Sequence, residues 1–370
     1  KLSYKEPRQA SGNTSLKFSI TLFLLGFSIS QLFWGPISEK YGRKKPIIIG
    51  LVLTNIGIIM AMLAPNVTLF NSGRFIEAFG LGVAPTLGRA MLIDTHDAVA
   101  FAATMAYGTI SANLMPAIAP IIGGHILVWF GWRYIFAALL IYGLVILFQI
   151  IYKTRETHAS QQPRLKILHT FKHYFETIKN REFVGYLLPY ALLTGAMIGY
   201  YTLTPFLFIT QLHISTKNYG FLSVVTVVTY ILGATYSRVF AKSLGVKKMV
   251  THGTILLIIA AISMMVAEVI SGLTVLSVLI PMAIYAFAAG IICPNSNAGA
   301  MHSMRHKAGT AGAMVGFSIY LASAILSTLI NILSLNSLLP LTSYIFIIAI
   351  LSLGSFYFLV ILKKSTSEEN

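Results

Sequence analysis

The sequence has little charge and almost no cysteine. Only 10% of its 370 residues are Asp, Glu, Lys or Arg, whereas a typical soluble domain has about 25%. The single cysteine, Cys293, excludes an internal disulfide and a zinc site built on pairs of cysteines. No segment matches the nucleotide-binding pattern G-x-x-x-x-G-K-[ST], and the scattered histidines form no catalytic or metal-binding set. We therefore expect no enzymatic activity, no cofactor and no metal.

Hydrophobic residues, by contrast, make up 56% of the chain. They gather in eleven long runs, and roughly 20 such residues cross the hydrocarbon core of a bilayer as one helix. The runs lack the two-residue period of barrel strands, and helices satisfy their own backbone polar groups in lipid. The sequence therefore predicts an all-α membrane protein. The runs are approximately residues 16–35, 46–64, 69–94, 98–127, 132–152, 183–211, 219–240, 249–270, 273–294, 309–333 and 342–362.

The basic residues, which give the chain a net charge of +16, gather in alternate loops. Cytoplasmic loops carry such an excess, so we expect the C-terminus in the cytoplasm, and the charge does not indicate nucleic acid. The loop after residue 94 is the exception, because it holds Asp94 and Asp97 but no Lys or Arg. We expect Asp94 to pair with Arg89 in the preceding helix. The basic loops are residues 36–45, 153–182, 241–248 and 305–307, together with the C-terminal tail.

A weak internal repeat links the two halves of the chain at offsets of 201 to 208 residues, and transporters often carry such repeats. Applied to residues 183–211, the offset places their counterpart before residue 1. We therefore expect twelve native helices, six in each half, with the first helix upstream of this sequence. The predicted domains are an N-terminal bundle (1–152), a cytoplasmic linker (153–182) and a C-terminal bundle (183–370). The matching pairs are Gly42/Gly245, Lys44/Lys247, Lys45/Lys248, Ala78/Ala286, Gly108/Gly309 and Thr109/Thr310.

Local motifs fit this layout. Residues 35–44, GPISEKYGRK, resemble the G-x-x-x-D-R-x-G-R-K/R signature of the major facilitator superfamily, with Glu39 and Lys40 at the Asp and first Arg positions. Residues 74–82, RFIEAFGLG, resemble its fourth-helix signature. The segments QLFWGPISEKYGRKKP, APIIGG, FGWRYIF and GTAGA are most similar to the Bcr/CflA group of drug exporters. This resemblance implies two pseudo-symmetric six-helix halves that exchange drugs for protons across a bacterial inner membrane, working as a monomer.

The segment 35–44 is predicted to be a conformational latch. Gly35 and Gly42 flank a cytoplasmic turn, where glycine allows close helix approach and a positive φ. Glu39 can cap the next helix or pair with a basic group. The alternative is simple topology, because basic residues gather in any cytoplasmic loop. The predicted latch residues are Gly35, Glu39, Lys40, Gly42, Arg43 and Lys44.

Arg74 and Glu77 are ionisable residues inside a predicted span. They are three residues apart and so share one helical face. Charges within a membrane are costly and mark pathways or relays, so both are candidates for coupling protons to substrate. The alternative is a pair that only stabilises the bundle, and such a pair would keep Glu77 ionised and weaken it as a proton carrier.

Two larger sets complete the predicted site. One resembles the fifth-helix motif of antiporters, where prolines each remove a helix bond and glycines permit tight contact, although ordinary small-residue packing explains it as well. The other set could line a substrate cavity, although each member also suits a helix–helix hydrogen bond. The first set is Gly108, Pro116, Pro120, Gly123 and Gly124, and the second is Gln31, Asn113, Tyr200, Tyr201, Tyr230, Asn295 and Tyr320.

The middle loop contains a basic amphipathic segment, residues 164–180, which suits the anionic inner leaflet of a bilayer. The leading functional hypothesis is a secondary active transporter that exports small amphipathic compounds in exchange for protons. One alternative is export or import of a dedicated metabolite such as a siderophore. A different class of alternative is a membrane sensor or scaffold that transports nothing.

Overall fold

A computed structural model describes residues 7–157, 167–304, 307–332 and 339–362. These ranges form helices and contain no β-strand, which confirms the predicted all-α fold. The helices are α1 (Pro7–Tyr41), α2 (Lys44–Met62), α3 (Val67–Leu81), α4 (Val83–Thr95), α5 (Ala98–Phe130), α6 (Trp132–Lys153), α7 (Ile167–Lys179), α8 (Arg181–Pro205), η1 (Phe206–Gln211), α9 (Thr216–Ser271), α10 (Val275–Ser303), α11 (Ala308–Ile332), α12 (Leu339–Phe356) and η3 (Tyr357–Ile361).

Within these described ranges, nine helices are long and apolar enough to cross a membrane. The sequence predicts eleven runs, and two helices account for the difference. α9 carries two of the runs, which meet at the non-helical residue Gly245. Among the described residues of α5, the segment Ile118–Phe130 is apolar but shorter than a membrane span.

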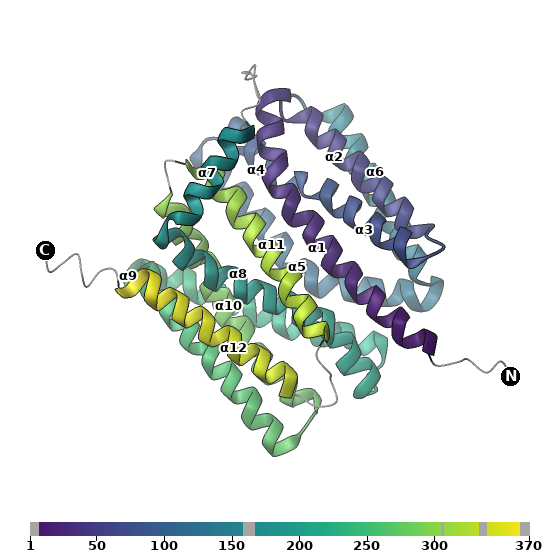
Figure 1. The fold of residues 1–370 in the computed structure, drawn as a ribbon, viewed down its shortest axis with the longest axis vertical. Helices are drawn as coiled ribbons and strands as arrows, with labels where there is room; N and C mark the ends of the chain where they lie inside the picture. Colours follow the sequence, from purple (N-terminus) through teal and green to yellow (C-terminus); the bar gives the residue numbers. More distant parts are fainter. Residues whose placement is uncertain (1–6, 158–166, 305–306, 333–338, 363–370) are drawn as a thin grey trace, which may run out of the picture. The chain divides into compact units, whose positions relative to one another are not determined.

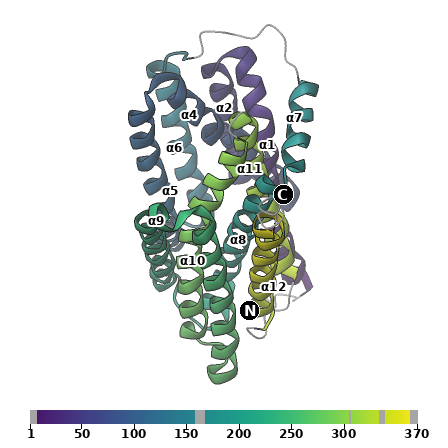
Figure 2. The ribbon, with the colours of Figure 1, turned by 90° about the vertical axis from the view of Figure 1, so that its left-hand side faces the viewer.

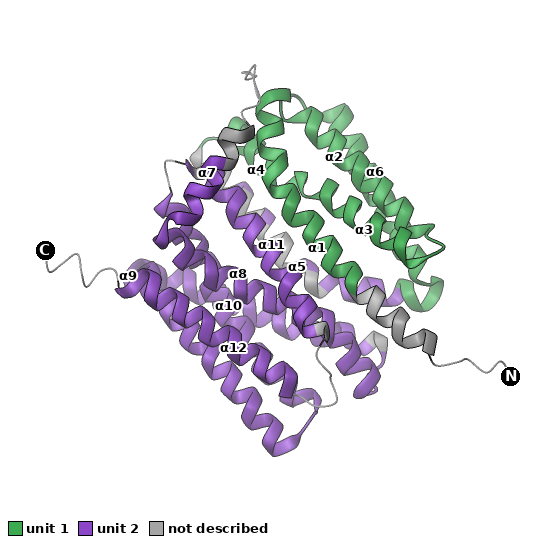
Figure 3. Ribbon diagram, in the orientation of Figure 1, with its two compact units in different colours: residues 1–101, 126–165 green, residues 102–125, 166–370 purple. Residues whose placement is uncertain are grey.

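The chain divides into two compact units (Figure 3). Unit 1 comprises residues 1–101 and 126–165, and unit 2 comprises residues 102–125 and 166–370. The predicted domains differ from these units chiefly in α5, whose residues 102–125 cluster with unit 2. The bounds of the two functional halves therefore stay a prediction.

Unit 1 is built around the close approach of α2 and α3. α3 also packs against α1, and α6 packs against α2 (Figure 1). A Cβ atom added to Gly57 of α2 would collide with the backbone nitrogen of Glu77 in α3, and one added to Gly73 would lie 2.7 Å from the backbone nitrogen of Ala61. Small residues thus bring the two backbones into contact, as in many membrane helix pairs.

Unit 2 has its largest helix contact between α9 and α10 (Figure 2). A Cβ atom on Gly233 would collide with the carbonyl oxygen of Phe287, and one on Gly290 would collide with that of Tyr230. α8, α11 and α12 enclose the remaining core, which includes the fully buried Leu257. Tyr200 belongs to this core, and Tyr201 and Tyr230 pack against it.

Candidate functional site

The predicted latch is centred on a turn of two residues. α1 continues to Tyr41 and α2 begins at Lys44, so the predicted loop 36–45 is wrong and only Gly42 and Arg43 lie between the two helices. Gly42 has a φ of +81°, a left-handed conformation that favours glycine. Gly35 lies inside α1, where its carbonyl oxygen accepts a hydrogen bond of 2.8 Å from the Ser38 hydroxyl.

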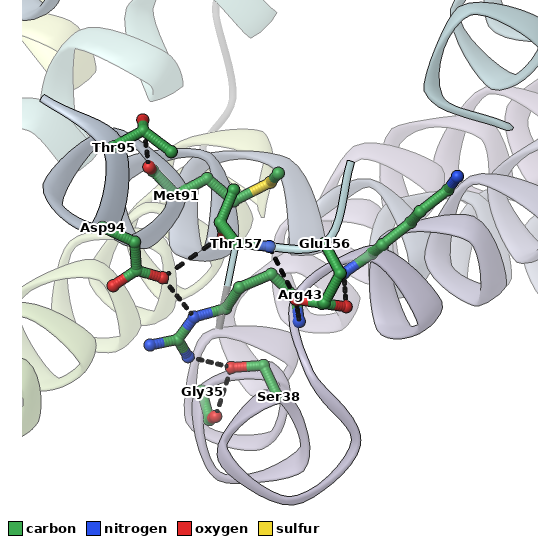
Figure 4. A network of polar contacts seen from close by, with 9 residues as sticks. Gly35, Ser38, Arg43, Met91, Asp94, Thr95, Glu156 and Thr157 are labelled. Carbon is green, nitrogen blue, oxygen red and sulfur yellow. Dashed lines mark hydrogen bonds and ion pairs between the residues drawn. The ribbon is translucent and has the colours of Figure 1, made fainter. Parts of the chain in front are cut away.

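The Arg43 side chain connects this turn to the end of α4 (Figure 4). Its Nε lies 3.1 Å from Oδ2 of Asp94, and the two side chains are only 13% and 21% exposed. A terminal nitrogen of Arg43 also donates to the hydroxyl of Ser38 at 2.6 Å. This geometry is a charge-assisted hydrogen bond that joins α1 to α4.

Glu156, which follows α6, binds the same turn from another side. Its two carboxylate oxygens accept the backbone N–H groups of Arg43 at 2.7 Å and Lys44 at 3.0 Å (Figure 4). These donors belong to the N-terminus of α2, where the first amides have no partner within the helix and a negative charge is favourable. The Lys44 ammonium in turn donates to the carbonyl oxygen of Ile151 at 2.8 Å.

The structure corrects the predicted partner of Asp94. Asp94 pairs with Arg43, whereas Arg89 is exposed. Residues five apart on a helix do not face each other, because helical neighbours are three or four residues apart. The pair also gives Asp94 a role beside the basic segment 36–45, because its carboxylate neutralises the charge of Arg43.

Not every predicted latch residue joins this network. Glu39 is exposed and, among the described residues, makes no hydrogen bond or ion pair. The Lys40 ammonium lies 4.9 Å from the centre of the Tyr41 ring, a cation–π contact. The two residues that depart from the superfamily signature therefore lie outside the network formed by Arg43 and Lys44.

Arg74 and Glu77 form the predicted ion pair in α3. Nη1 of Arg74 lies 2.7 Å from Oε2 of Glu77, and the two side chains are 19% and 6% exposed. The guanidinium carbon also lies 4.3 Å from the ring centre of Phe23 in α1 and 5.7 Å from that of Phe136 in α6. The pair is therefore held among aromatic rings from two other helices.

A groove lies between α1 and α3, and neither Arg74 nor Glu77 is among the residues that line it. It has a volume of about 670 Å³, and its wall includes Phe75 and Ile76, the two residues between Arg74 and Glu77 in sequence. Thr68, Asn71 and Ser72 supply polar groups to the same wall. A mostly apolar groove with a few polar groups suits an amphipathic ligand, although none of the predicted cavity residues lines it.

Two of the predicted cavity residues form hydrogen bonds between helices. Gln31 of α1 accepts a hydrogen bond of 3.0 Å from the hydroxyl of Thr86 in α4. Asn295 of α10 is buried and donates to the hydroxyl of Ser237 in α9 at 2.6 Å. Both contacts match the alternative interpretation, in which these side chains hold helices together.

Tyrosines gather in the core of unit 2. Tyr200 is 3% exposed and its ring centre lies 5.6 Å from that of Tyr201. The Tyr201 hydroxyl lies 3.1 Å from the hydroxyl oxygen of Thr226. Tyr230 and Tyr320 are partly buried, and Tyr230 packs against the same core as Tyr200. The side chain of Asn113 lies outside the described residues.

The antiporter-like segment lies within the single helix α5. A Cβ atom added to Gly108 or Gly123 would meet no atom within 4 Å, so the predicted tight contact is absent at these two positions of the described chain. Pro120 and Gly124 are partly buried, and the Pro116 side chain lies outside the described residues. A role for this segment in exchange stays a prediction.

In unit 2, α7 is fastened to the start of α11 by three side chains. The Lys307 ammonium donates to Oε2 of Glu176 at 2.6 Å, and Nδ1 of His173 lies 3.1 Å from the same oxygen. These hydrogen bonds lower the pKa of the Glu176 carboxyl to about 2. The buried side chains of Tyr174 and Thr177 fix the adjoining face of α7.

Sequence interpretation missed Glu156, Glu176 and the partner of Asp94. One signal was available, because the chain has only 11 acidic residues against 27 basic ones. An isolated acid in a basic cytoplasmic segment is a natural counter-ion for it. Which base each acid meets depends on the three-dimensional arrangement of loops that are far apart in sequence.

The geometry defines a class of protein: a helical membrane protein with an ion pair inside one span. In the described part of the chain no group of three or more acidic, His or Cys side chains could hold a metal ion. The family model for the Major Facilitator Superfamily matches residues 9–327. The chain belongs to this superfamily of transporters.

Relatives and solved structures agree with this assignment. A bicyclomycin resistance protein homolog of Haemophilus influenzae is 25% identical, over 93% of this chain and 86% of the relative. Multidrug resistance protein D of Escherichia coli is 26% identical, over 86% of this chain and 78% of the relative. A crystal structure of a D-xylose–proton symporter covers 97% of this chain and 89% of its own with a TM-score of 0.74 at 18% identity, which shows a shared fold.

The predicted superfamily, fold and resemblance to drug exporters are thereby confirmed. The protein is an integral membrane transporter of a small-molecule substrate and is not an enzyme.

Proposed function

We propose that this transporter exports small amphipathic compounds in exchange for protons. The observation that carries the proposal is the Arg74–Glu77 ion pair inside a membrane-spanning helix. A mostly apolar groove lies on the same helix. Two relatives bear names that refer to bicyclomycin resistance and multidrug resistance. The exporter works by alternating access, in which the two halves rock about a central site.

In this mechanism the Glu77 carboxylate exchanges its partner. It pairs with Arg74 in one state, and proton uptake by Glu77 dissolves the pair in the other. The Arg74 guanidinium then keeps its contacts with Phe23 and Phe136, which stabilise its charge. A pair with two discrete arrangements can couple proton binding to a change of conformation, because each ligand favours a different state.

The Arg43 turn serves as the latch that stabilises one of these conformations. Its bonds to Asp94 and Glu156 join the ends of α1, α4 and α6 to the start of α2. A change of angle between these helices has to break or stretch at least one of the bonds. The latch thereby adds to the difference in free energy between the two transport states.

Further features complete the proposal. The protein works as a monomer in the bacterial inner membrane, with its C-terminus and the α7 segment on the cytoplasmic side. The exposed Phe175 and Ile178 of α7 contact the lipid surface there. Tyr201 and Tyr230, which are only partly buried, supply aromatic surface and hydroxyl groups to the substrate path.

The proposal is tested by drug protection in a bacterial strain that lacks its own exporters. The full chain is expressed beside the variants Glu77→Gln and Arg74→Gln, and growth is measured against a panel of amphipathic drugs. We expect the wild type to raise the inhibitory concentration of several drugs at least fourfold, and both variants to lose this protection. A role confined to packing would lower protein level and unfolding temperature together with protection, so both are measured in the same membranes.

Two results would overturn the proposal. Undiminished protection by Glu77→Gln at equal protein level would show that the pair is not the coupling element. Protection against no drug of the panel would favour a dedicated metabolite as substrate.

A further inference from the structure

The outer face of α6 carries a groove that the transport mechanism does not use. Its volume is about 450 Å³, and it is formed by one face of this single helix. Along the helix, the four apolar lining residues come first, and the two polar lining residues come last, near the end of α6. The lining residues are Ile141, Leu144, Val145, Phe148, Gln149 and Lys153.

α6 is the candidate span that is most exposed on the described protein. Only 6% of its most apolar stretch is buried, whereas the other candidate spans are 33% to 61% buried. Lipid is therefore the neighbour of this helix in the membrane. Since acyl chains and leucine side chains are equally apolar, a groove of this kind gains selectivity from its polar end.

Aromatic residues set the depth of this helix in the bilayer. Trp132 and Tyr134 are exposed at its first end and Tyr152 is exposed at its last, as expected for the two interfacial belts. The 22 residues of α6 span about 33 Å, close to the ~30 Å hydrocarbon core. The groove from Ile141 to Lys153 then extends about 18 Å, roughly the depth of one leaflet.

The polar end of the groove is positively charged. Lys153 is exposed, and so are Arg155, two residues further, and Lys45 in the first turn of α2. The bond from Lys44 to the carbonyl oxygen of Ile151 holds the start of α2 beside this end of α6. One nearby carboxylate, Glu156, keeps its charge but does not balance Lys45, Lys153 and Arg155, and Asp94 is paired with Arg43.

We propose that this groove binds one anionic phospholipid of the cytoplasmic leaflet. Lys153 holds the phosphate, the exposed amide of Gln149 donates to an ester or phosphate oxygen, and an acyl chain lies over Val145 and Ile141. The site is independent of the substrate path and of Glu77. It gives the α2–α6 edge of unit 1 a specific lipid partner.

The test is lipid binding to the purified full chain in neutral detergent, measured by native mass spectrometry. Phosphatidylglycerol and phosphatidylcholine with identical acyl chains are compared. A basic residue at a membrane surface contributes roughly fivefold in affinity for an anionic lipid, so Lys153→Gln should weaken the first phosphatidylglycerol about fivefold and leave phosphatidylcholine unchanged. Val145→Trp should fill the groove and weaken both lipids.

Matched variants separate this site from general effects. Lys242→Gln removes an exposed lysine of unit 2, and Leu139→Trp adds a ring to the opposite face of α6; both should behave as the wild type. The double variant of Lys153 and Val145 should bind phosphatidylglycerol more weakly than either single variant, because the two residues contact different ends of one lipid and their losses combine. Equal effects of Lys153→Gln and Lys242→Gln would overturn the proposal. A change from dimer to monomer in Val145→Trp would also overturn it, by assigning the groove to a second copy of the chain.

Discussion

The turns at Gly42 and Gly245 occupy matching places in the internal repeat, one in each unit. Gly42 has a φ of +81° and Gly245 a φ of +80°. In each case the lysine two residues further donates to a carbonyl oxygen near the end of the last helix of its unit. These bonds are 2.8 Å from Lys44 to Ile151 and 3.5 Å from Lys247 to Val360.

The two turns differ in the polar groups that surround them. A Cβ atom at Gly42 would lie 2.5 Å from Oε2 of Glu156, whereas one at Gly245 would meet no atom within 4 Å. Arg43 pairs with Asp94, and its counterpart in the second turn is the apolar Val246. The fold thus requires the glycine turn in both halves, but among the described residues the ionic network surrounds the first turn alone. The glycine turn is therefore a feature of the shared architecture, whereas the ionic network is a feature of the proposed latch.

The largest predicted effect is the difference in stability between the variants Gly42→Ala and Gly245→Ala. Both variants place a side chain in the left-handed region, at about 1–2 kcal/mol. Gly42→Ala should lose about 1.5–3 kcal/mol more, because its Cβ displaces the Glu156 carboxylate from the helix amides. Thermal unfolding of the purified variants in one detergent checks this order. Equal losses would mean that Glu156 contributes nothing to the turn.

Removing the charge of Asp94 should have the next largest effect. Asp94→Asn leaves the mostly buried Arg43 without its counter-ion, and we expect a loss of about 1.5–3 kcal/mol. Asp97→Asn is the matched control, because asparagine can keep the bond that Asp97 accepts from the backbone N–H of Ala100. Both are measured by unfolding and by substrate turnover. If Asp94→Asn were as stable as Asp97→Asn, the Arg43–Asp94 ion pair would not contribute to the latch.

Glu156→Gln should have a smaller effect. The amide retains one acceptor oxygen but loses the negative charge at the N-terminus of α2, which is worth about 0.3–1 kcal/mol. High salt should reduce the difference from wild type, since exposed charges are screened. A difference that persists unchanged in high salt would assign the effect to shape rather than charge.

The smallest predicted effect concerns pH and the contact of α7 with α11. Because Lys307 and His173 lower the pKa of Glu176 from 4.5 to about 2, the stabilising contact is complete above pH 4.5 and is lost as the pH falls toward 2. Lys307→Gln removes the main cause of the lowered pKa of Glu176, so the contact between α7 and α11 should begin to weaken at a higher pH than in the wild type. Amide exchange across residues 167–179, corrected for intrinsic rates, checks the shift. An identical pH profile in both proteins would contradict the assignment.

Much of the fold follows from features that the sequence shows locally. Long apolar runs predict the spans, and the repeat of Gly42 at Gly245 predicts two similar turns with the same backbone conformation. The spacing of Arg74 and Glu77 predicts their contact, since residues three apart share a helical face. These properties depend on neighbours along the chain.

The rest depends on contacts between distant segments. The helix extends past Gly35 to Tyr41 because polar residues can continue a helix beyond the membrane, which hydropathy alone does not show. Asp94 meets Arg43 rather than Arg89 because the ends of α1 and α4 come together in space. For Gln31 and Asn295, composition does not distinguish a cavity wall from a helix contact, and the structure gives both residues a partner on another helix.

The most direct test of the central claim is drug-dependent proton movement by the purified full chain in sealed proteoliposomes. A pH-sensitive dye inside the vesicles reports protons while an amphipathic drug is added outside. The account predicts a proton flux opposite to drug movement with the wild type, and its loss with Glu77→Gln at equal reconstitution. Drug transport without proton movement, or unchanged proton flux with Glu77→Gln, would contradict it.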